Sequence, residues 1–173
     1  SCIGIGAWHF GNFTNEEEAK KIIDYSVSEG VNYFDTAPMY GNSNSEKILG
    51  AVLKKHRNNV MIGTKIGLRT IGTGKNSRAE IIKLDKKHIE TPIDTSLQSL
   101  QTDYIDYYQL HYFDDSTPIV ETLEALEKAK QKGKILNIGI CNYEKKNLIE
   151  LFNTGDLSNI CLLYTSDAAD DSL

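Results

Sequence analysis

Short runs of β-branched and aromatic residues alternate with amphipathic stretches along most of the 173-residue chain, at intervals of about thirty residues. The strand-like runs are residues 2–8, 31–35, 60–65, 104–111 and 135–141. Parallel strands have to be joined by crossovers, which are usually helices, so this alternation predicts a parallel sheet built from β–α–β units. The pattern therefore indicates an α/β fold.

Capping signals mark the ends of the predicted helices. Thr14 and Glu17 have the spacing of a capping box, which predicts the start of the first helix, and Gly30 ends it. Similar signals place further helices after Ser45 and Glu46, after Thr117 as cap with Pro118 in the first turn, and over residues 144–153. Each of these helices follows one of the predicted strands.

One more helix contains a proline. Ile89, Ile93 and Leu97 have helical spacing, but Pro92 lies among them and would remove a backbone hydrogen bond. Two interpretations fit these residues. We favour a helix that kinks at Pro92 after a loose first turn; in the alternative, the helix begins with Thr91 as cap and Pro92 in the first position.

The longest interval between strands holds residues 66–85, which are rich in Gly, Ser and Thr and directly follow a strand. We expect a large loop there, at the C-terminal edge of the strands. Five strand–helix units then fill the chain. A (β/α)8 barrel needs eight units in roughly 250 residues, whereas a five-stranded doubly wound sheet fits this length. The repeat alone leaves both architectures open.

Charge and hydropathy exclude two classes of partner. The net charge is −5, and no Lys/Arg cluster forms the basic surface that nucleic acid requires. The basic run at 53–57 is best explained as a solvated helix face. No apolar stretch approaches the roughly 20 residues that span a bilayer, and no signal peptide opens the sequence. We expect a protein that binds neither nucleic acid nor membrane.

Cysteine and histidine usage bears on compartment and metals. Cys2, Cys141 and Cys161 are an odd number without close spacing, which favours free thiols in a reducing compartment, so we expect a cytoplasmic protein. Three of the four histidines lack metal-ligand spacing with each other or with a cysteine. We therefore expect no metal site.

Polar residues end several of the predicted strands. Asp35 ends the second strand, Lys65 the third and His111 the fourth, while Tyr40 follows Asp35 by five residues. The carboxyl ends of parallel barrel strands lie on one rim, where barrel active sites are built. Each residue alone has an ordinary structural explanation as a turn or strand terminus. An acid, a base, a phenol and an imidazole on one rim together favour an active site.

Five motifs, in order and at fitting distances, resemble signatures of the aldo-keto reductases. They are FDTAPMYG at 34–41, NSEKILG at 44–50, GTK at 63–65, SLQSLQTDYIDYYQLH at 96–111 and GKILNIGICNY at 133–143. The resemblance runs from about residue 2 to about residue 155. It implies a (β/α)8 TIM barrel, truncated here after about five β/α units, in place of the doubly wound sheet.

By motif position, the resemblance implies that Asp35, Tyr40, Lys65 and His111 are the family's catalytic tetrad. Tyr40 would donate a proton to the developing alkoxide, and the ammonium of Lys65 would lower the pKa of Tyr40 toward the working range. Asp35 would hold Lys65 through a charge-assisted hydrogen bond. A neutral His111 would orient and polarise the substrate carbonyl.

The resemblance also implies a cofactor and its contacts. NADPH is the expected cofactor, with Asn142 bonding the nicotinamide carboxamide and Asp35 also in the cofactor site. Cys141 stands where the family usually has Ser, a stronger hydrogen-bond donor. Trp8 and His111 are the expected substrate contacts, although Trp8 could equally be a packing aromatic at the barrel mouth. The family's phosphate-binding loops lie beyond residue 173.

The function implied is that of an NADPH-dependent oxidoreductase that reduces an aldehyde or ketone to an alcohol. The first alternative is a cofactor-binding regulatory subunit, since channel β-subunits share this barrel and tetrad. The second is a fragment that is inactive as translated. The expected substrate is a small-molecule carbonyl compound, and the sequence leaves the oligomeric state open.

The last residues break the repeat. A sixth strand should begin near Leu157, and instead an acidic run of small residues follows. CLLYTSDAAD, from Cys161, resembles the translation of an adapter used in sequencing libraries. We therefore expect residues 1–160 to be an incomplete reductase barrel and residues 161–173 to be a non-native tail.

Overall fold

A computed structural model describes residues 1–72, 76, 78–153 and 160–162. Within them, one parallel sheet has the strand order β1-β2-β3-β6-β7-β8. Its strands are β1 Ile5–Gly6, β2 Tyr33–Asp35, β3 Met61–Ile66, β6 Ile105–Leu110, β7 Ile135–Ile140 and β8 Ile160–Leu162. Each strand pairs with the next strand of the sheet in chain order, as in a (β/α)8 barrel, whereas a doubly wound sheet reverses its order at a switch point. The barrel architecture is therefore confirmed.

Strand β8 corrects the expectation of five strands. It pairs in parallel with β7, with Ile138 opposite Ile160 and Ile140 opposite Leu162. This strand was not predicted from the sequence, because its three apolar residues are followed by an acidic run of small residues. β8 crosses the expected boundary between residues 160 and 161. The division at that point stays a prediction, since residues 163–173 lie outside the described part of the chain.

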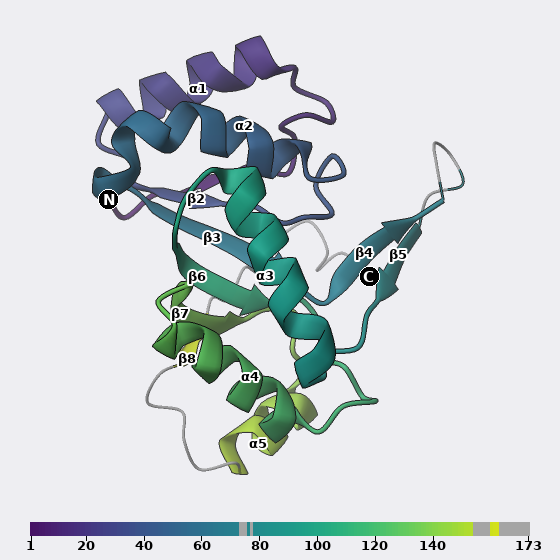
Figure 1. Cartoon of the computed structure of the whole chain (residues 1–173). Coiled ribbons are helices and arrows are strands. Elements are labelled where there is room, and N and C mark those ends of the chain that lie inside the picture. Colours follow the sequence, from purple (N-terminus) through teal and green to yellow (C-terminus); the bar gives the residue numbers. More distant parts are fainter. Residues whose placement is uncertain (73–75, 77, 154–159, 163–173) are drawn as a thin grey trace.

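Helices accompany the strands in chain order. Their bounds are α1 Glu16–Ser28, α2 Asn44–Leu53, the 3-10 helix η1 Lys54–Asn59, α3 Lys86–Leu100, α4 Ile119–Gln131 and α5 Lys145–Asn153. Figure 1 shows α1 and α2 over one end of the sheet, α3 across its middle, and α4 and α5 at the other end. Consecutive helices from α1 to α4 pack on one another. None of the described helices is long and apolar enough to cross a membrane.

Three helix starts differ from the expected ones. Helix α2 begins at Asn44, so Ser45 and Glu46 lie in its first turn and do not precede it. The side chain of Asn15 caps α1 by accepting a hydrogen bond from the Glu18 N–H at 2.9 Å, so the capping box at Thr14 is wrong by one residue. In α4 the cap position belongs to Pro118, while the Thr117 hydroxyl donates to Asp114. The Thr117 hydroxyl is therefore bonded to a carboxylate three residues earlier in the chain, and it does not cap the helix.

Helix α3 runs through Pro92. It begins at Lys86, after the Asp85 side chain accepts from the N–H groups of Lys87 and His88, so a start at Thr91 is wrong. The buried face of α3, which includes Ile89 and Ile93, packs in the core and offsets the one backbone hydrogen bond that Pro92 removes.

A β-hairpin replaces the loop expected over residues 66–85. Strand β4 (Leu68–Ile71) pairs antiparallel with β5 (Arg78–Ile81), and Arg69 forms an ion pair with Glu80 directly opposite it. The hairpin projects from the sheet beside α3 (Figure 1). Its Gly, Ser and Thr content indicated a loop, because composition does not register cross-strand pairing.

The two faces of the sheet have different roles. Phe34, Ile62 and Tyr108 are fully buried in the core, and Thr64 reaches Glu46 of α2, so this face packs against the helices. Residues one position along the strands point the opposite way. Lys65 is one of these, and its alternation with Thr64 places polar groups on the inner side of the barrel.

Candidate active site

The residues predicted to share a rim follow the carboxyl ends of adjacent strands. Asp35 is the last residue of β2, Lys65 lies near the end of β3, and His111 and Cys141 follow β6 and β7 directly. Hydrogen bonds also link these ends: the His111 N–H donates to the Ile66 carbonyl at 2.7 Å. The parallel sheet thus brings together side chains that are far apart in the sequence.

Lys65 is the centre of the site. Its ammonium donates to Asp35 Oδ2 at 2.5 Å and to the Thr36 carbonyl at 2.8 Å. The side chain is 6% exposed, so this charge is held out of water by a paired carboxylate and a backbone dipole. Lys65 Nζ also lies 5.2 Å from the centre of the Tyr40 ring.

Tyr40 lies in the turn between β2 and α2. The turn needs left-handed backbone at Gly41, where φ is +57°, and a Cβ on Gly41 would approach the Gly11 carbonyl oxygen to 3.0 Å. Burial raises the pKa of the Tyr40 phenol above 10.0, and the charge of Lys65 opposes this without overcoming it. Lys65 thus lowers the pKa of Tyr40, as expected, but burial keeps that pKa above its usual value, and Tyr40 is a protonated phenol.

His111 faces Tyr40 edge to face, with ring centres 6.1 Å apart and planes at 84°. Burial, assisted by the positive charge of Lys65, lowers the pKa of His111 to about 3. The imidazole is therefore neutral at physiological pH, as a carbonyl-orienting role requires.

Cys141 and Asn142 close the site at the end of β7. The buried Cys141 thiol lies 3.4 Å from the His111 carbonyl oxygen, and burial raises its pKa to about 11, so it is a neutral, weak donor. Asn142 is exposed, adopts a left-handed φ of +54°, and donates through Nδ2 to the His111 carbonyl at 3.0 Å. Among the described residues, no hydrogen bond is recorded at Asn142 Oδ1.

Trp8 follows β1 and is half exposed. Its ring contacts His9 and Phe13, at centroid distances of 4.9 and 5.5 Å, in the loop between β1 and α1. This exposed aromatic group fits either explanation of Trp8, and a substrate contact stays a prediction.

Two residues beside the site were missed from the sequence. Gln109 and Tyr33 lie two residues before His111 and Asp35, so each faces the same side of its strand as its partner. Period-two alternation could have identified both positions. The hydrogen bonds of Gln109 could not have been identified, because they reach Tyr33 and Asp35 of β2, which lie more than 70 residues away in the sequence.

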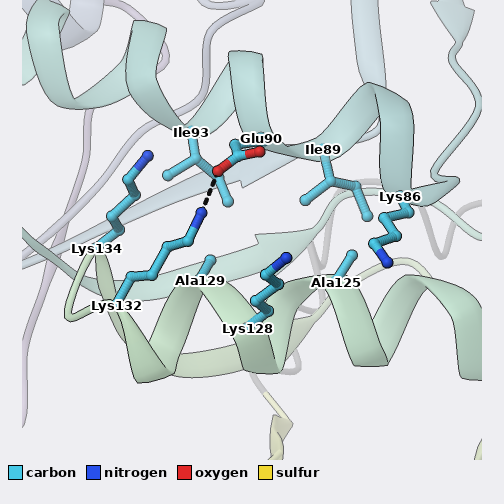
Figure 2. Close-up of a pocket in the computed structure, with 9 residues that line it drawn as sticks. All are labelled: Lys86, Ile89, Glu90, Ile93, Ala125, Lys128, Ala129, Lys132 and Lys134. Carbon is cyan, nitrogen blue, oxygen red and sulfur yellow. Dashed lines mark hydrogen bonds and ion pairs between the residues drawn. The ribbon is translucent and has the colours of Figure 1, made fainter.

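A separate cavity of about 40 Å³ lies between α3 and α4, lined by four lysines and Glu90 over an apolar floor (Figure 2). Lys132 is paired with Glu90, and Lys134 with Asp94. The cavity is on the helical side of the sheet and contains none of the predicted site residues. In the described part of the chain, no cluster of three or more His, Cys, Asp or Glu side chains could hold a metal ion.

The model of the Aldo/keto reductase family matches residues 2–162. The chain belongs to the aldo/keto reductase family. Among its relatives, aldo-keto reductase YhdN of Bacillus subtilis is 36% identical over 149 residues, which cover 83% of this chain and 44% of that protein. A probable voltage-gated potassium channel subunit beta of Arabidopsis thaliana is 34% identical over 160 residues, covering 90% of this chain and 47% of the relative.

Solved reductase structures share the fold. The holo form of aldo-keto reductase AKR11C1 from Bacillus halodurans superposes with a TM-score of 0.81 at 35% identity, covering 94% of this chain and 53% of that chain. An aldo-keto reductase from Klebsiella pneumoniae in complex with NADPH gives 0.74 at 27% identity, covering 88% and 49%. The chain thus spans about half the length of the relatives it matches.

Proposed function

We propose that the full-length protein containing this chain is an NADPH-dependent reductase that converts an aldehyde or ketone to an alcohol. The observation that supports this most directly is the buried Lys65 ammonium, bonded to Asp35 and adjacent to the protonated Tyr40. The neutral His111 completes the group. Three groups with separate tasks, an acid, a cation and a neutral orienting imidazole, are what carbonyl reduction requires of a protein.

Tyr40 is the proton donor in this proposal. Its phenol is protonated at neutral pH, so it can hydrogen-bond the carbonyl oxygen and transfer a proton as charge develops there. The ammonium of Lys65 stabilises the phenolate left behind, and Asp35 and the Thr36 carbonyl keep that ammonium in place. His111 orients the carbonyl oxygen without competing as an acid, because its pKa is lowered to about 3.

The donors and acceptors of the rim fit a nicotinamide. Asn142 is exposed, and its Nδ2 is directed to the His111 carbonyl, which leaves Oδ1 to accept from the N–H of a carboxamide. Asp35 lies beneath the same rim, and Trp8 offers an exposed aromatic surface to a substrate. When bound, NADPH supplies the hydride. The NADPH complex of the Klebsiella relative supports this choice of cofactor.

NADPH oxidation, followed at 340 nm with the full-length protein and a panel of aliphatic and aromatic aldehydes and ketones, tests the proposal. We expect saturable turnover with at least one carbonyl class and formation of one alcohol per NADPH consumed. Saturable NADPH binding without turnover on any of the panel would contradict it.

A second candidate is a cofactor-binding regulatory subunit, which the Arabidopsis channel-subunit relative favours. This candidate predicts NADPH binding without turnover in the same assay, so one experiment separates the two functions. A cytoplasmic location fits either function, because Cys2 and Cys141 are both free thiols.

A further inference from the structure

Gln109 is a buried polar residue that the proposed mechanism does not use. It is the penultimate residue of β6, two positions before His111, and its side chain faces the inner side of the barrel with 1% exposure. We propose that Gln109 is a positioning residue that fixes the Asp35 carboxylate and, through it, the ammonium of Lys65. This inference rests on the proposed function, in which Lys65 acts on Tyr40.

The contacts give each oxygen of Asp35 its own donor. Gln109 Nε2 donates to Asp35 Oδ1 at 3.2 Å, while Lys65 Nζ donates to Oδ2 at 2.5 Å. An ionised carboxylate can only accept, so the NH2 group of the Gln109 amide, and not its oxygen, has to face Asp35. The second N–H of the same amide is directed to the Tyr33 hydroxyl at 3.3 Å. Donors on both oxygens restrict rotation of the carboxylate.

The sheet register explains how Gln109 reaches Asp35 across a whole strand. Gln109 is paired with Lys65 on the neighbouring strand β3, and Asp35 is paired with Gly63 on the other side of β3. A Cβ on Gly63 would lie 2.5 Å from the Tyr33 hydroxyl and 3.1 Å from Gln109 Nε2. Because residue 63 is a glycine, there is space beside β3 for the Gln109 side-chain amide to reach the Asp35 carboxylate of β2.

Lys65 depends on this arrangement because one of its two recorded acceptors is the Asp35 carboxylate. A carboxylate that rotates away would release the ammonium from its position beside the Tyr40 ring. Displacements of about 1 Å in a catalytic group are enough to cost on the order of 100-fold in rate. Gln109 thus acts on the reaction through two intermediaries and touches neither substrate nor proton donor in this proposal.

Gln109→Met in the full-length protein tests the proposal. Methionine keeps the length and volume of glutamine but has no N–H donor. We expect kcat for carbonyl reduction to fall about ten-fold or more, with KM and the Kd for NADPH changed by less than about two-fold. Tm should fall only modestly, because the apolar replacement packs in the same space while the Asp35 carboxylate and the Tyr33 hydroxyl each lose one hydrogen bond. The matched control is Tyr108→Phe on the same strand: its hydroxyl is buried without a partner in the described structure and faces the helices, so kcat should be unchanged.

Gly63→Ala, a substitution on β3, tests the same contact between Gln109 and its partners on β2. Its Cβ would lie 2.5 Å from the Tyr33 hydroxyl and 3.1 Å from Gln109 Nε2, so it would push on both partners of the Gln109–Tyr33 contact, and this variant should also lower kcat. The double variant Gly63→Ala/Gln109→Met should lose little more than Gln109→Met alone, because both changes break one contact. Fully additive losses would show that the two residues act separately and would overturn the proposal.

A crystal structure of Gln109→Met separates this inference from the proposed function. We expect the Asp35 carboxylate to rotate and its short contact with Lys65 to lengthen beyond hydrogen-bonding distance. If the wild-type protein reduces no carbonyl, the proposed function fails while this structure still decides the role of Gln109. An unchanged Asp35 rotamer, or a kcat within about two-fold of wild type, overturns the proposal.

Discussion

At the scale of single residues, burial favours the neutral forms of Tyr40 and His111 by shifting their pKa values in opposite directions. Removal from water disfavours the charged form of each group, which raises the pKa of the phenol and lowers that of the imidazole. Lys65 assists the shift of His111 and opposes that of Tyr40. The rim therefore holds an uncharged phenol, an uncharged imidazole and an ammonium that is fixed by its hydrogen bonds.

Tyr40→Phe should remove the proton donor and little else. In the full-length protein we expect kcat for carbonyl reduction to fall by about 10²- to 10⁴-fold, because the acid is lost while the ring keeps its packing. The Kd for NADPH, measured by fluorescence titration, should change little. Tyr25→Phe, an exposed phenol on α1, is the control and should leave both constants unchanged. Turnover within a few-fold of wild type in Tyr40→Phe would mean that another group is the acid.

Glu46 is a residue whose burial opposes its charge. It is fully buried on α2, where Oε1 accepts from Thr64 at 2.7 Å and Oε2 has no hydrogen-bond partner in the described structure. Burial raises the pKa of Glu46. A carboxyl group with a raised folded-state pKa stabilises the fold below the pKa of the unfolded chain, and this contribution is lost as pH rises through the folded-state pKa.

Glu46→Gln should therefore stabilise the full-length protein at pH 8, because it keeps an acceptor for Thr64 and removes a buried charge. The advantage over wild type should shrink toward pH 4, where Glu46 is protonated. Urea denaturation at both pH values measures this, with the exposed Glu124→Gln on α4 as control. An advantage of Glu46→Gln that is the same at pH 4 and pH 8 would exclude a titrating Glu46 as its cause.

At the scale of elements, Asp114 joins the segment before helix α3 to the start of helix α4. Its carboxylate accepts from the Leu84 N–H at 2.8 Å, just before α3, and from the hydroxyls of Ser116 and Thr117, just before α4. Burial acts to raise the pKa of Asp114, but these hydrogen bonds outweigh it and lower the pKa below its usual range. One side chain thus fixes the starts of two helices that pack on each other.

Asp114→Ala should destabilise the full-length protein by about 2 to 4 kcal/mol at pH 7. The buried Leu84 N–H and the hydroxyls of Ser116 and Thr117 would all lose their acceptor. A lowered folded-state pKa means that this stabilisation is present above the pKa of the unfolded chain and is lost as pH falls through the folded-state value. The difference between wild type and variant, measured by chemical denaturation, should therefore shrink in acid.

The neighbouring Asp115→Ala is the matched control for Asp114→Ala. Asp115 is exposed, so its removal should change the free energy of unfolding by less than about 0.5 kcal/mol. Equal effects of the two substitutions would show that the Asp114 hydrogen bonds contribute little.

At the scale of the whole molecule, the described sheet is open. Its two edges are β1, a strand of two residues, and β8, a strand of three. In a closed barrel every strand has neighbours on both sides, whereas an open edge presents unpaired backbone groups to other chains.

We therefore expect the 173 residues expressed alone to associate through their edges, to unfold without a sharp cooperative transition, and to show no NADPH-dependent reductase activity. Size-exclusion chromatography and calorimetry, with the full-length protein as control, measure this. A monomer with a sharp thermal transition, or saturable NADPH binding in the micromolar range, would contradict the expectation.

The sequence by itself determined the family, the alternation of five of the strands with helices, and the placing of polar residues at the carboxyl ends of those strands. Asp35, Lys65 and His111 could be assigned to one edge because parallel strands carry their carboxyl ends together, a property of chain direction alone. The prediction of helix caps was less accurate, since the Thr117 hydroxyl can bond either to the first turn of its own helix or to Asp114, and it bonds to Asp114. The hairpin over 68–81 was missed for a different reason, because its pairing depends on residues of the opposite strand.

Only the tertiary structure decided the electrostatics and the supporting contacts of the site. The direction of the pKa shift of Tyr40 depends on whether the effect of burial exceeds the effect of the Lys65 charge. The burial of Tyr40 depends in turn on residues that belong to separate parts of the chain. Gln109 reaches Asp35 from 74 residues away, through a space that a Cβ on Gly63 would narrow. Local patterns record interactions within a few residues, whereas these properties arise from residues that meet only after the sheet has formed.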